Sequence, residues 1–109
     1  MKQHLPSLES KHPQIREFLG KLEASLPSGE YQLVDFWDAD PCAIGVAARD
    51  DQRRLVYVST YEQEDGTYAF ECEAPPDDGS DDYQVVEEGE NLPFDALLQK
   101  IRSHLLRGP

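Results

Sequence analysis

The sequence predicts a two-layer α+β fold, in which a five-stranded antiparallel meander carries an N-terminal and a C-terminal helix on one face (α-β-β-β-β-β-α). Amphipathic helical patterns bracket the chain, and the segment between them is rich in β-branched and aromatic residues. The connections between the candidate strands are too short for parallel crossovers. Because a chain of 109 residues has the length of one domain, we assign residues 1–109 to a single α+β domain.

The first helix is predicted within PQIREFLGKLEASL, residues 13–26. Pro13 suits the first helical turn, and the Pro27-Ser28-Gly29 sequence ends the helix. The apolar residues recur at the spacing of one helical stripe, which we expect to pack on the sheet. This stripe consists of Ile15, Phe18, Leu19, Leu22 and Leu26.

The central segment contains five candidate strands, joined by short turns of which Asp65-Gly66 is a strong hairpin signal. Two of the strands are apolar on both faces, whereas two helices cover only one face of a sheet. The second face around Tyr57, Tyr61 and Trp37 is therefore expected either to be covered by these aromatic rings themselves or to meet a partner. The candidate strands are Tyr31–Trp37, Ala43–Ala48, Arg54–Tyr61, Thr67–Cys72 and Tyr83–Glu87.

The second helix is predicted within NLPFDALLQKIRSHLLRG, residues 91–108. Asn91 is the expected N-cap, Asp95 favours the first turn, and Arg102 favours the last turn. Its apolar stripe has the same spacing as that of the first helix, so this helix is also expected on the sheet. The stripe consists of Phe94, Leu97, Leu98, Ile101 and Leu105.

The chain is strongly acidic, with 22 Asp and Glu against 10 Lys and Arg and a net charge of −12. Such a field repels nucleic-acid backbones and anionic lipid, and it attracts cationic partners. Solubility alone is an alternative explanation of the charge. We therefore expect no direct nucleic-acid binding and no membrane association. With no apolar leader in the first residues, we also expect a cytoplasmic location.

Three aspartates surround the single tryptophan in VDFWDADP, and they raise the question of a metal site or a catalytic pair. Asp35, Asp38 and Asp40 do not have the spacing of a calcium loop, and strand geometry sends Asp35 and Asp38 to opposite faces. No partner residues indicate a substrate pocket for two carboxylates. We therefore predict no metal ligands and no catalytic residues here.

The remaining reactive side chains do not form a recognisable site. Cys42 and Cys72 are far apart and have no metal-ligand or redox spacing. His4, His12 and His104 lie near no nucleophile, and we expect them to face solvent or to lie at helix ends. The isolated glycines form no phosphate-binding loop. The sequence thus predicts no cofactor and no enzymatic activity.

The topology nevertheless brings acidic and aromatic residues together. Alternate turns of an antiparallel meander lie at the same end of the sheet, so the first and third turns are expected to be neighbours. The fifth strand should also finish there, near Glu87, Glu88 and Glu90. We call this predicted partner-binding region the acidic–aromatic end. It consists of Asp35, Trp37, Asp38, Asp40, Tyr61, Glu62, Glu64 and Asp65.

The segments DFWDADPCAIGVA, RLVYVSTY, DGTYAFECE and NLPFDALLQKIRSHL together resemble small uncharacterised acidic bacterial α+β proteins. Some proteins of this kind serve as immunity proteins in toxin systems. The resemblance covers most of the chain and implies a class only, namely a compact acidic protein that binds and blocks a toxin, often a basic one. No functional residue is transferred from it.

The resulting hypothesis is a small non-catalytic protein-binding module, with an immunity-type inhibitor of a basic toxin or enzyme as its specific form. A basic protein is the expected partner, and the protein itself is expected to be a monomer or a weak homodimer. A second hypothesis is a dimeric secretion-chaperone-like protein, although such chaperones usually carry a helix within the strand series. A metal-binding protein or enzyme that uses Asp35 and Asp38 ranks third.

Overall fold

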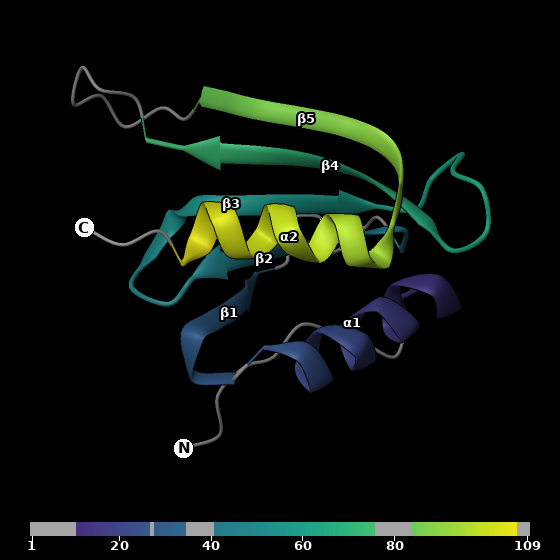
Figure 1. Ribbon diagram of the computed structural model, residues 1–109, viewed down its shortest axis with the longest axis horizontal. Helices are drawn as coiled ribbons and strands as arrows, with labels where there is room; N and C mark the ends of the chain where they lie inside the picture. The colour runs from purple at the N-terminus through teal and green to yellow at the C-terminus, as the bar shows by residue number, and fades with distance from the viewer. Residues whose placement is uncertain (1–10, 27, 35–40, 76–83, 107–109) are drawn as a thin grey trace.

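The computed structural model describes residues 11–26, 28–34, 41–75 and 84–106. Helix α1 (Pro13–Ser25) is followed by the short 3-10 helix η2 (Ser28–Glu30), and helix α2 (Phe94–Leu105) closes the described chain. Between them, five antiparallel strands form one sheet in chain order (Figure 1). This arrangement confirms the predicted fold. The strands are β1 (Tyr31–Val34), β2 (Ala43–Ala48), β3 (Asp51–Ser59), β4 (Thr67–Ala74) and β5 (Gln84–Pro93).

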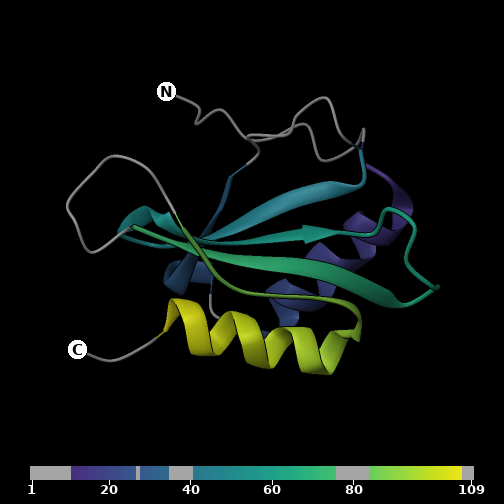
Figure 2. The same ribbon diagram turned by 90° about the horizontal axis from the view of Figure 1, so that it is seen from above.

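Both helices lie on the same side of the sheet (Figure 2). The predicted helical stripes point inward, because Ile15, Phe18 and Leu22 of α1 are fully buried, as are Leu97 and Ile101 of α2. Burying these side chains removes the apolar stripe of each helix from water, which is the main force that holds such layers together. The sheet contributes Ile44, Val46, Val56, Val58, Tyr68, Phe70 and Cys72 to the same core.

Aromatic and polar contacts connect the two helices to each other and to the sheet. The ring of Phe18 lies 5.4 Å from that of Tyr68 on β4 and 6.0 Å from that of Phe94 at the start of α2. At the other end of the helices, Nη2 of Arg102 donates a hydrogen bond to the carbonyl oxygen of Ser25 (2.9 Å). The first helix is therefore held against the sheet and α2 by the Phe18 ring in its middle and by the Ser25 carbonyl at its C-terminal end.

His104 lies in the last turn of α2, as one of the two expected placements of the histidines has it, but it is buried and does not face solvent. Its side chain is on the inward face of α2 one turn after Ile101, and the residue is only 6% exposed. Nε2 of His104 donates a hydrogen bond to the carbonyl oxygen of Glu73 on β4 (2.8 Å). This bond gives the buried ring a partner, as a buried polar group requires.

The fifth strand is longer than predicted, and α2 begins later. β5 runs from Gln84 to Pro93, past the predicted end at Glu87. Asn91 is therefore not the N-cap of α2, a role that Pro93 takes without a side-chain hydrogen bond. The physical reason is that a residue before proline avoids the helical conformation, so the helix begins only after Pro93.

The other strand boundaries differ by a few residues. β3 begins at Asp51 and ends at Ser59, and β4 continues to Ala74. β5 carries two irregularities in its pairing with β4, one opposite Tyr68–Phe70 and one opposite Cys72–Glu73. Such bulges add a residue to one strand and bend it, and they leave no simple signal in the sequence.

Gly89 on β5 lies directly against a buried ring, so we expect Gly89→Ala to destabilise the protein. A β-carbon at this position would come 2.8 Å from Cε1 of Phe70, which is buried in the core. Moving that ring disturbs a packed core, and such overpacking costs about 1–3 kcal/mol. Urea unfolding followed by far-ultraviolet circular dichroism measures the loss.

Gly20→Ala provides the control, because nothing lies within 4 Å of the added β-carbon and the residue is in the middle of helix α1. In an exposed helix, alanine is favoured over glycine by about 1 kcal/mol. An unchanged or increased free energy of unfolding for Gly89→Ala would show that the contact between β5 and Phe70 is wrong.

Candidate functional site

The turn between β3 and β4 is held by its own hydrogen bonds. The Gln63 N–H donates to the Thr60 carbonyl (3.2 Å), and the Thr67 N–H donates to the Glu64 carbonyl (3.0 Å). The Thr67 hydroxyl donates to that same carbonyl (2.7 Å). Gly66 has a φ of +79°, a conformation that glycine adopts without strain and that the Asp-Gly signal predicts. The turn is therefore a defined structure that can present side chains in fixed directions.

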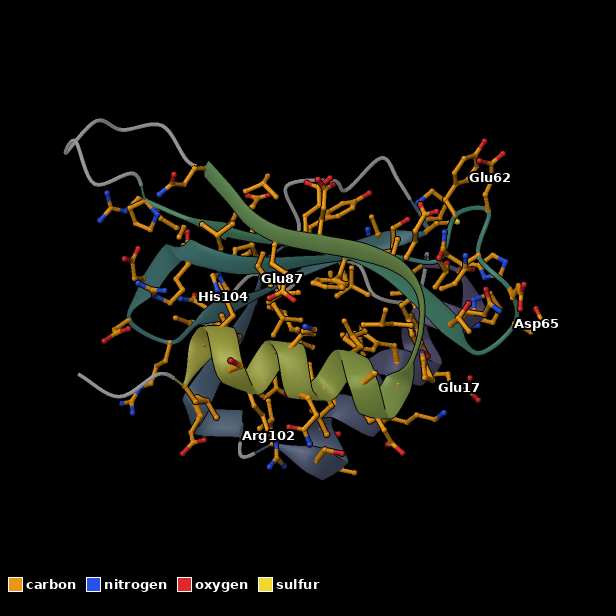
Figure 3. The ribbon with its side chains drawn as sticks, turned by 45° about the horizontal axis from the view of Figure 1, so that its top comes forward. Glu17, Glu62, Asp65, Glu87, Arg102 and His104 are labelled. Atoms are coloured by element: carbon orange, nitrogen blue, oxygen red, sulfur yellow. The ribbon has the colours of Figure 1, made fainter. Side chains whose placement is uncertain are left out.

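Four residues of the predicted acidic–aromatic end lie in this turn, and all four are exposed. Tyr61 has 66% of its surface accessible, an unusual exposure for a large aromatic residue. Glu62 and Asp65 project from the end of the molecule (Figure 3). Glu64 lies between them in the chain. The other predicted members, Asp35, Trp37, Asp38 and Asp40, lie outside the described residues.

The end of β5 packs against the same turn through Asn91. The Asn91 N–H donates to Oε1 of Gln63 (2.6 Å), and Oδ1 of Asn91 accepts from the Glu64 N–H (3.4 Å). Asn91 has a φ of +56°, which marks the bulge that brings the strand to the turn. Glu90 is consequently placed beside Glu62, as the meander predicts for the end of the fifth strand.

Glu87 and Glu88 lie within β5, away from its end. Glu87 faces the helices and forms an ion pair with Lys100 of α2, which removes it from the acidic–aromatic end. Glu88 points to the opposite face, where it stands directly across from Glu71 of β4. Two like charges directly opposite each other on neighbouring strands destabilise the fold, so stability does not explain this pair.

The face of the sheet opposite the helices, which we call the helix-free face, is apolar at one side and acidic at the other. Val34, Ala47 and Leu55 form a small buried cluster toward β1. Toward β5, Tyr57 of β3 is half-buried and pairs with Glu71, and Glu71 pairs with Glu88. The described part of this face therefore places the half-buried Tyr57 beside a row of glutamates.

A shallow pocket of about 370 Å³ opens where the helix-free face meets the β3–β4 turn. Its walls come from three strands and the turn, and they include aromatic rings and carboxylates side by side. The residues that define its character are Tyr57, Tyr61, Glu62 and Glu90, with Ser59 and Ala69 between them. The sequence did not predict this pocket, because the pairing irregularity opposite Tyr68–Phe70 sets the position of Glu90.

The start of α1 also reaches this end of the sheet, which the sequence did not predict. Nε2 of Gln14 donates to Oδ1 of Asp65 (3.2 Å), and the His12 N–H donates to the Pro41 carbonyl (2.7 Å). Lys11 is buried nearby in the chain. Asp65 is thus partly engaged within the protein, whereas no described basic side chain pairs with Glu62, Glu64 or Glu90.

At the opposite end of the sheet, Asp51 is paired with Arg53. Oδ1 of Asp51 accepts hydrogen bonds from the backbone N–H of Arg53 (3.0 Å) and from its Nε (3.3 Å). These bonds lower the pKa of Asp51 below its ordinary value, mainly through the backbone N–H. Glu62, Glu64 and Glu90 at the acidic–aromatic end form no such ion pair with a described basic residue.

The described residues contain no arrangement typical of a metal centre or a reactive thiol. No group of three or more His, Cys, Asp or Glu side chains within the described ranges converges to hold a metal ion. Burial raises the pKa of Cys72 to about 11, so its thiol is protonated at neutral pH and is a poor nucleophile. Asp35 and Asp38, the residues of the metal hypothesis, lie outside these ranges.

Glu73 on β4 is a buried carboxyl group, and its replacement should change how stability depends on pH. Burial, and then the charge of Glu71, raises its pKa above the ordinary value of 4.5. The folded state therefore prefers the protonated group, and it loses stability as the pH rises through the raised pKa. We expect Glu73→Gln to unfold at a higher temperature than the wild type at pH 7.

Thermal unfolding from pH 3 to pH 8 tests this expectation. Below pH 4, both Glu73 and its glutamine replacement are neutral, so the two proteins should unfold at similar temperatures. Glu64→Gln is the control, because its carboxyl group is exposed in the turn. A gap between Glu73→Gln and the wild type that stays constant across this pH range would contradict the raised pKa.

No protein-family model matches the chain, and no curated protein or solved structure was found that matches it. The fold and the site define the class as a small two-layer α+β protein with an acidic, aromatic surface at one end of its sheet. Neither helix in the described ranges has both the length and the apolar character that crossing a membrane requires.

Proposed function

We propose that the protein is a non-catalytic binding module whose acidic–aromatic end, together with the neighbouring part of the helix-free face, receives a basic surface of another protein. Its specific form is an immunity-type inhibitor that covers the cationic cleft of a toxin or enzyme. The observation that carries this proposal is the exposed Tyr61 set among Glu62, Glu64 and Glu90, which have no basic partner in the described chain.

The local energetics support binding more than stability. A large exposed aromatic ring and a row of like charges cost stability, since the ring contacts water and Glu71 repels Glu88 across the strands. Violations of this kind are typical of functional surfaces. An incoming cationic surface relieves the repulsion and buries the ring, so the same features favour a complex. Aromatic anchors with a polar rim are typical of interface hot spots.

The net charge of −12 sets the kinetics of this proposed recognition. Opposite charges accelerate association, and rate constants of steered complexes reach about 10⁸–10⁹ M⁻¹s⁻¹ at low salt. Screening acts over about 10 Å at 0.1 M salt, so exposed carboxylates lose most of their steering above that concentration. A complex of this kind should form much more slowly at high salt, while its dissociation changes less.

One observation favours the dimeric alternative, a secretion-chaperone-like protein. Val85 and Val86 on the edge strand β5 are 43% and 53% exposed, and an open sheet edge can pair with a second copy. Glu87, Glu88 and Glu90 follow on the same strand, however, and would meet the like charges of that copy. Light scattering decides between the two forms, because a monomer at 100 µM is incompatible with the dimeric chaperone.

Affinity capture from a lysate of the native host tests the proposed function. The immobilised protein is exposed to lysate at low salt and eluted with high salt, and the eluted proteins are identified. The purified partner is then titrated against the wild type by calorimetry. We expect a basic protein that binds with one-to-one stoichiometry and that loses its own activity in the complex.

The bait variant Glu62→Lys/Glu64→Lys provides the control for nonspecific charge binding. Glu23→Lys/Glu30→Lys, at exposed positions on α1 and η2, changes the net charge equally. Partner capture that survives the first variant and fails with the second would place binding elsewhere. If the wild type and both variants all fail to capture a basic protein that high salt releases, this result would count against the proposed function itself.

A further inference from the structure

We propose that the pocket between the β3–β4 turn and the helix-free face is a receptor for one arginine side chain of the partner. This proposal rests on the proposed function, and it identifies the chemical group of the partner that enters this pocket. The pocket holds about 370 Å³, near the lower end of the range of about 300–1,000 Å³ for small-ligand sites. A single long side chain therefore suits it better than a folded segment.

The pocket walls are fixed before any ligand arrives. Oγ of Ser59 accepts from the Tyr61 N–H (3.1 Å), and Nε2 of Gln63 donates to the Tyr61 carbonyl (3.3 Å). Oε1 of Gln63 in turn accepts from the Asn91 N–H of β5 (2.6 Å). Tyr61, the turn and β5 thus form one hydrogen-bonded unit, so binding requires little reorganisation of the backbone.

The pocket offers two carboxylates as hydrogen-bond acceptors for a ligand. The amide oxygens of Gln63 and Asn91 already accept backbone hydrogen bonds. The carboxylates of Glu62 and Glu90 have no hydrogen-bond or ion-pair partner in the described chain, and both belong to the pocket wall. A ligand that supplies donors and positive charge satisfies both groups, whereas an anion or a neutral acceptor satisfies neither.

The two tyrosines select a planar cation among such ligands. Tyr57 and Tyr61 contribute aromatic surface to the same pocket. A guanidinium group stacks on aromatic rings through its flat face and donates in its plane to carboxylates, while an ammonium is a compact and strongly hydrated charge. Arginine can therefore use the rings and both glutamates at once, and its apolar stem covers Ala69 and the Ser59 region.

Charge excludes the other occupants that the pocket could hold. A second copy of this chain brings its own net charge of −12, and a phosphate-bearing ligand meets Glu62 and Glu90 directly. Arg53 of this chain is engaged with Asp51 at the far end of the sheet, and Arg102 is engaged between the helices. A partner's arginine is the occupant that the charges and the rings both favour.

Nuclear magnetic resonance titration with short blocked peptides tests this proposal. Acetyl-Gly-Arg-Gly-amide is added to the ¹⁵N-labelled protein at low salt, beside the same peptides with lysine or citrulline in place of arginine. We expect saturable shifts at Tyr57, Tyr61, Glu62 and Glu90 with the arginine peptide. Citrulline keeps the shape but loses the charge, and it should bind about tenfold more weakly.

Matched variants distinguish binding in the pocket from general attraction to the negative charge of the protein. Glu90→Gln and Glu64→Gln remove the same charge, but only Glu90 belongs to the pocket wall. Glu90→Gln should weaken the arginine peptide about three- to tenfold, and Glu64→Gln less than about twofold. Tyr61→Leu should remove most of the preference for arginine over lysine, because leucine keeps apolar contact without an aromatic face.

The outcomes distinguish the two proposals. Equal weakening by Glu64→Gln and Glu90→Gln, or equal binding of the arginine and lysine peptides to the wild type, would overturn the arginine pocket. The captured basic protein could still bind in that case, and the proposed function would stand without the pocket. Shifts confined to residues on the helical side would also overturn the pocket, since they would place the peptide on another surface.

Discussion

Replacing Phe18 with alanine is expected to lower the free energy of unfolding by about 3–5 kcal/mol, the usual cost of removing a fully buried phenylalanine. Phe18 has no exposed surface, and its ring contacts Tyr68 of β4 and Phe94 of α2. The substitution therefore leaves a cavity where both helices meet the sheet. Since domains of this size are stable by only about 5–15 kcal/mol, the variant should be close to unfolding at 37 °C.

Urea unfolding followed by circular dichroism at 222 nm measures this loss, with Glu17→Ala as the control on the neighbouring exposed position of α1. The control should stay within about 0.5 kcal/mol of the wild type, as surface substitutions usually do. A loss below about 1 kcal/mol for Phe18→Ala would mean that α1 is not docked on the sheet through this ring.

Reversing two charges at the pocket, Glu62→Lys with Glu90→Lys, is expected to lower the association rate constant for the captured basic partner by about 10- to 100-fold at low salt. Each substitution removes a favourable charge and adds a repulsive one at the place where the complex forms. Both side chains are exposed, so the fold should be retained. Stopped-flow mixing at several salt concentrations measures the effect.

The control is Glu23→Lys with Glu30→Lys, which gives the same net charge from exposed positions away from the pocket. Its rate constant should fall by less than about threefold, because those charges do not belong to the pocket where the complex forms. The difference between the two variants should shrink as salt is added. Equal rate constants for both variants at low salt would show that only the net charge matters.

Local sequence patterns predict most of the fold, and β5 is the strand that they predict only in part. The helical stripes around Phe18 and Ile101 are regular, and each is buried as its spacing predicts. β5 is exposed along most of its length and rich in charge, so it lacks the apolar alternation of a half-buried strand. Beyond Glu87, where the predicted strand ends, the pairing with β4 imposes the strand conformation that the local sequence does not indicate.

His104 and Asn91 show two further limits of sequence reasoning. His104 occupies a stripe position, but its burial depends on the Glu73 carbonyl, which lies 31 residues earlier in the chain. Asn91 has the side chain of a good N-cap, and its partner is instead the Glu64 backbone in a distant turn. Both residues find partners only through tertiary structure, which local propensity does not encode.

The sequence predicts which segments of the candidate site lie close together, but it does not predict the pocket that they form. Antiparallel topology brings the β3–β4 turn to the end of β5, and the turn residues Tyr61, Glu62, Glu64 and Asp65 are exposed there. The shape of the pocket depends on the pairing irregularity in β5, which sets where Glu90 points. The approach of α1 to Asp65 likewise depends on how the helix docks.

The most direct test of the account is a map of the complex. The ¹⁵N-labelled protein is mixed with the captured basic partner, and the change of each backbone signal is recorded. If the partner binds the acidic–aromatic end, the largest changes should cluster at Tyr57, Tyr61, Glu62, Glu88 and Glu90, with little change along the outer surfaces of α1 and α2. Changes centred on the two helices, with an undisturbed β3–β4 turn, would contradict it.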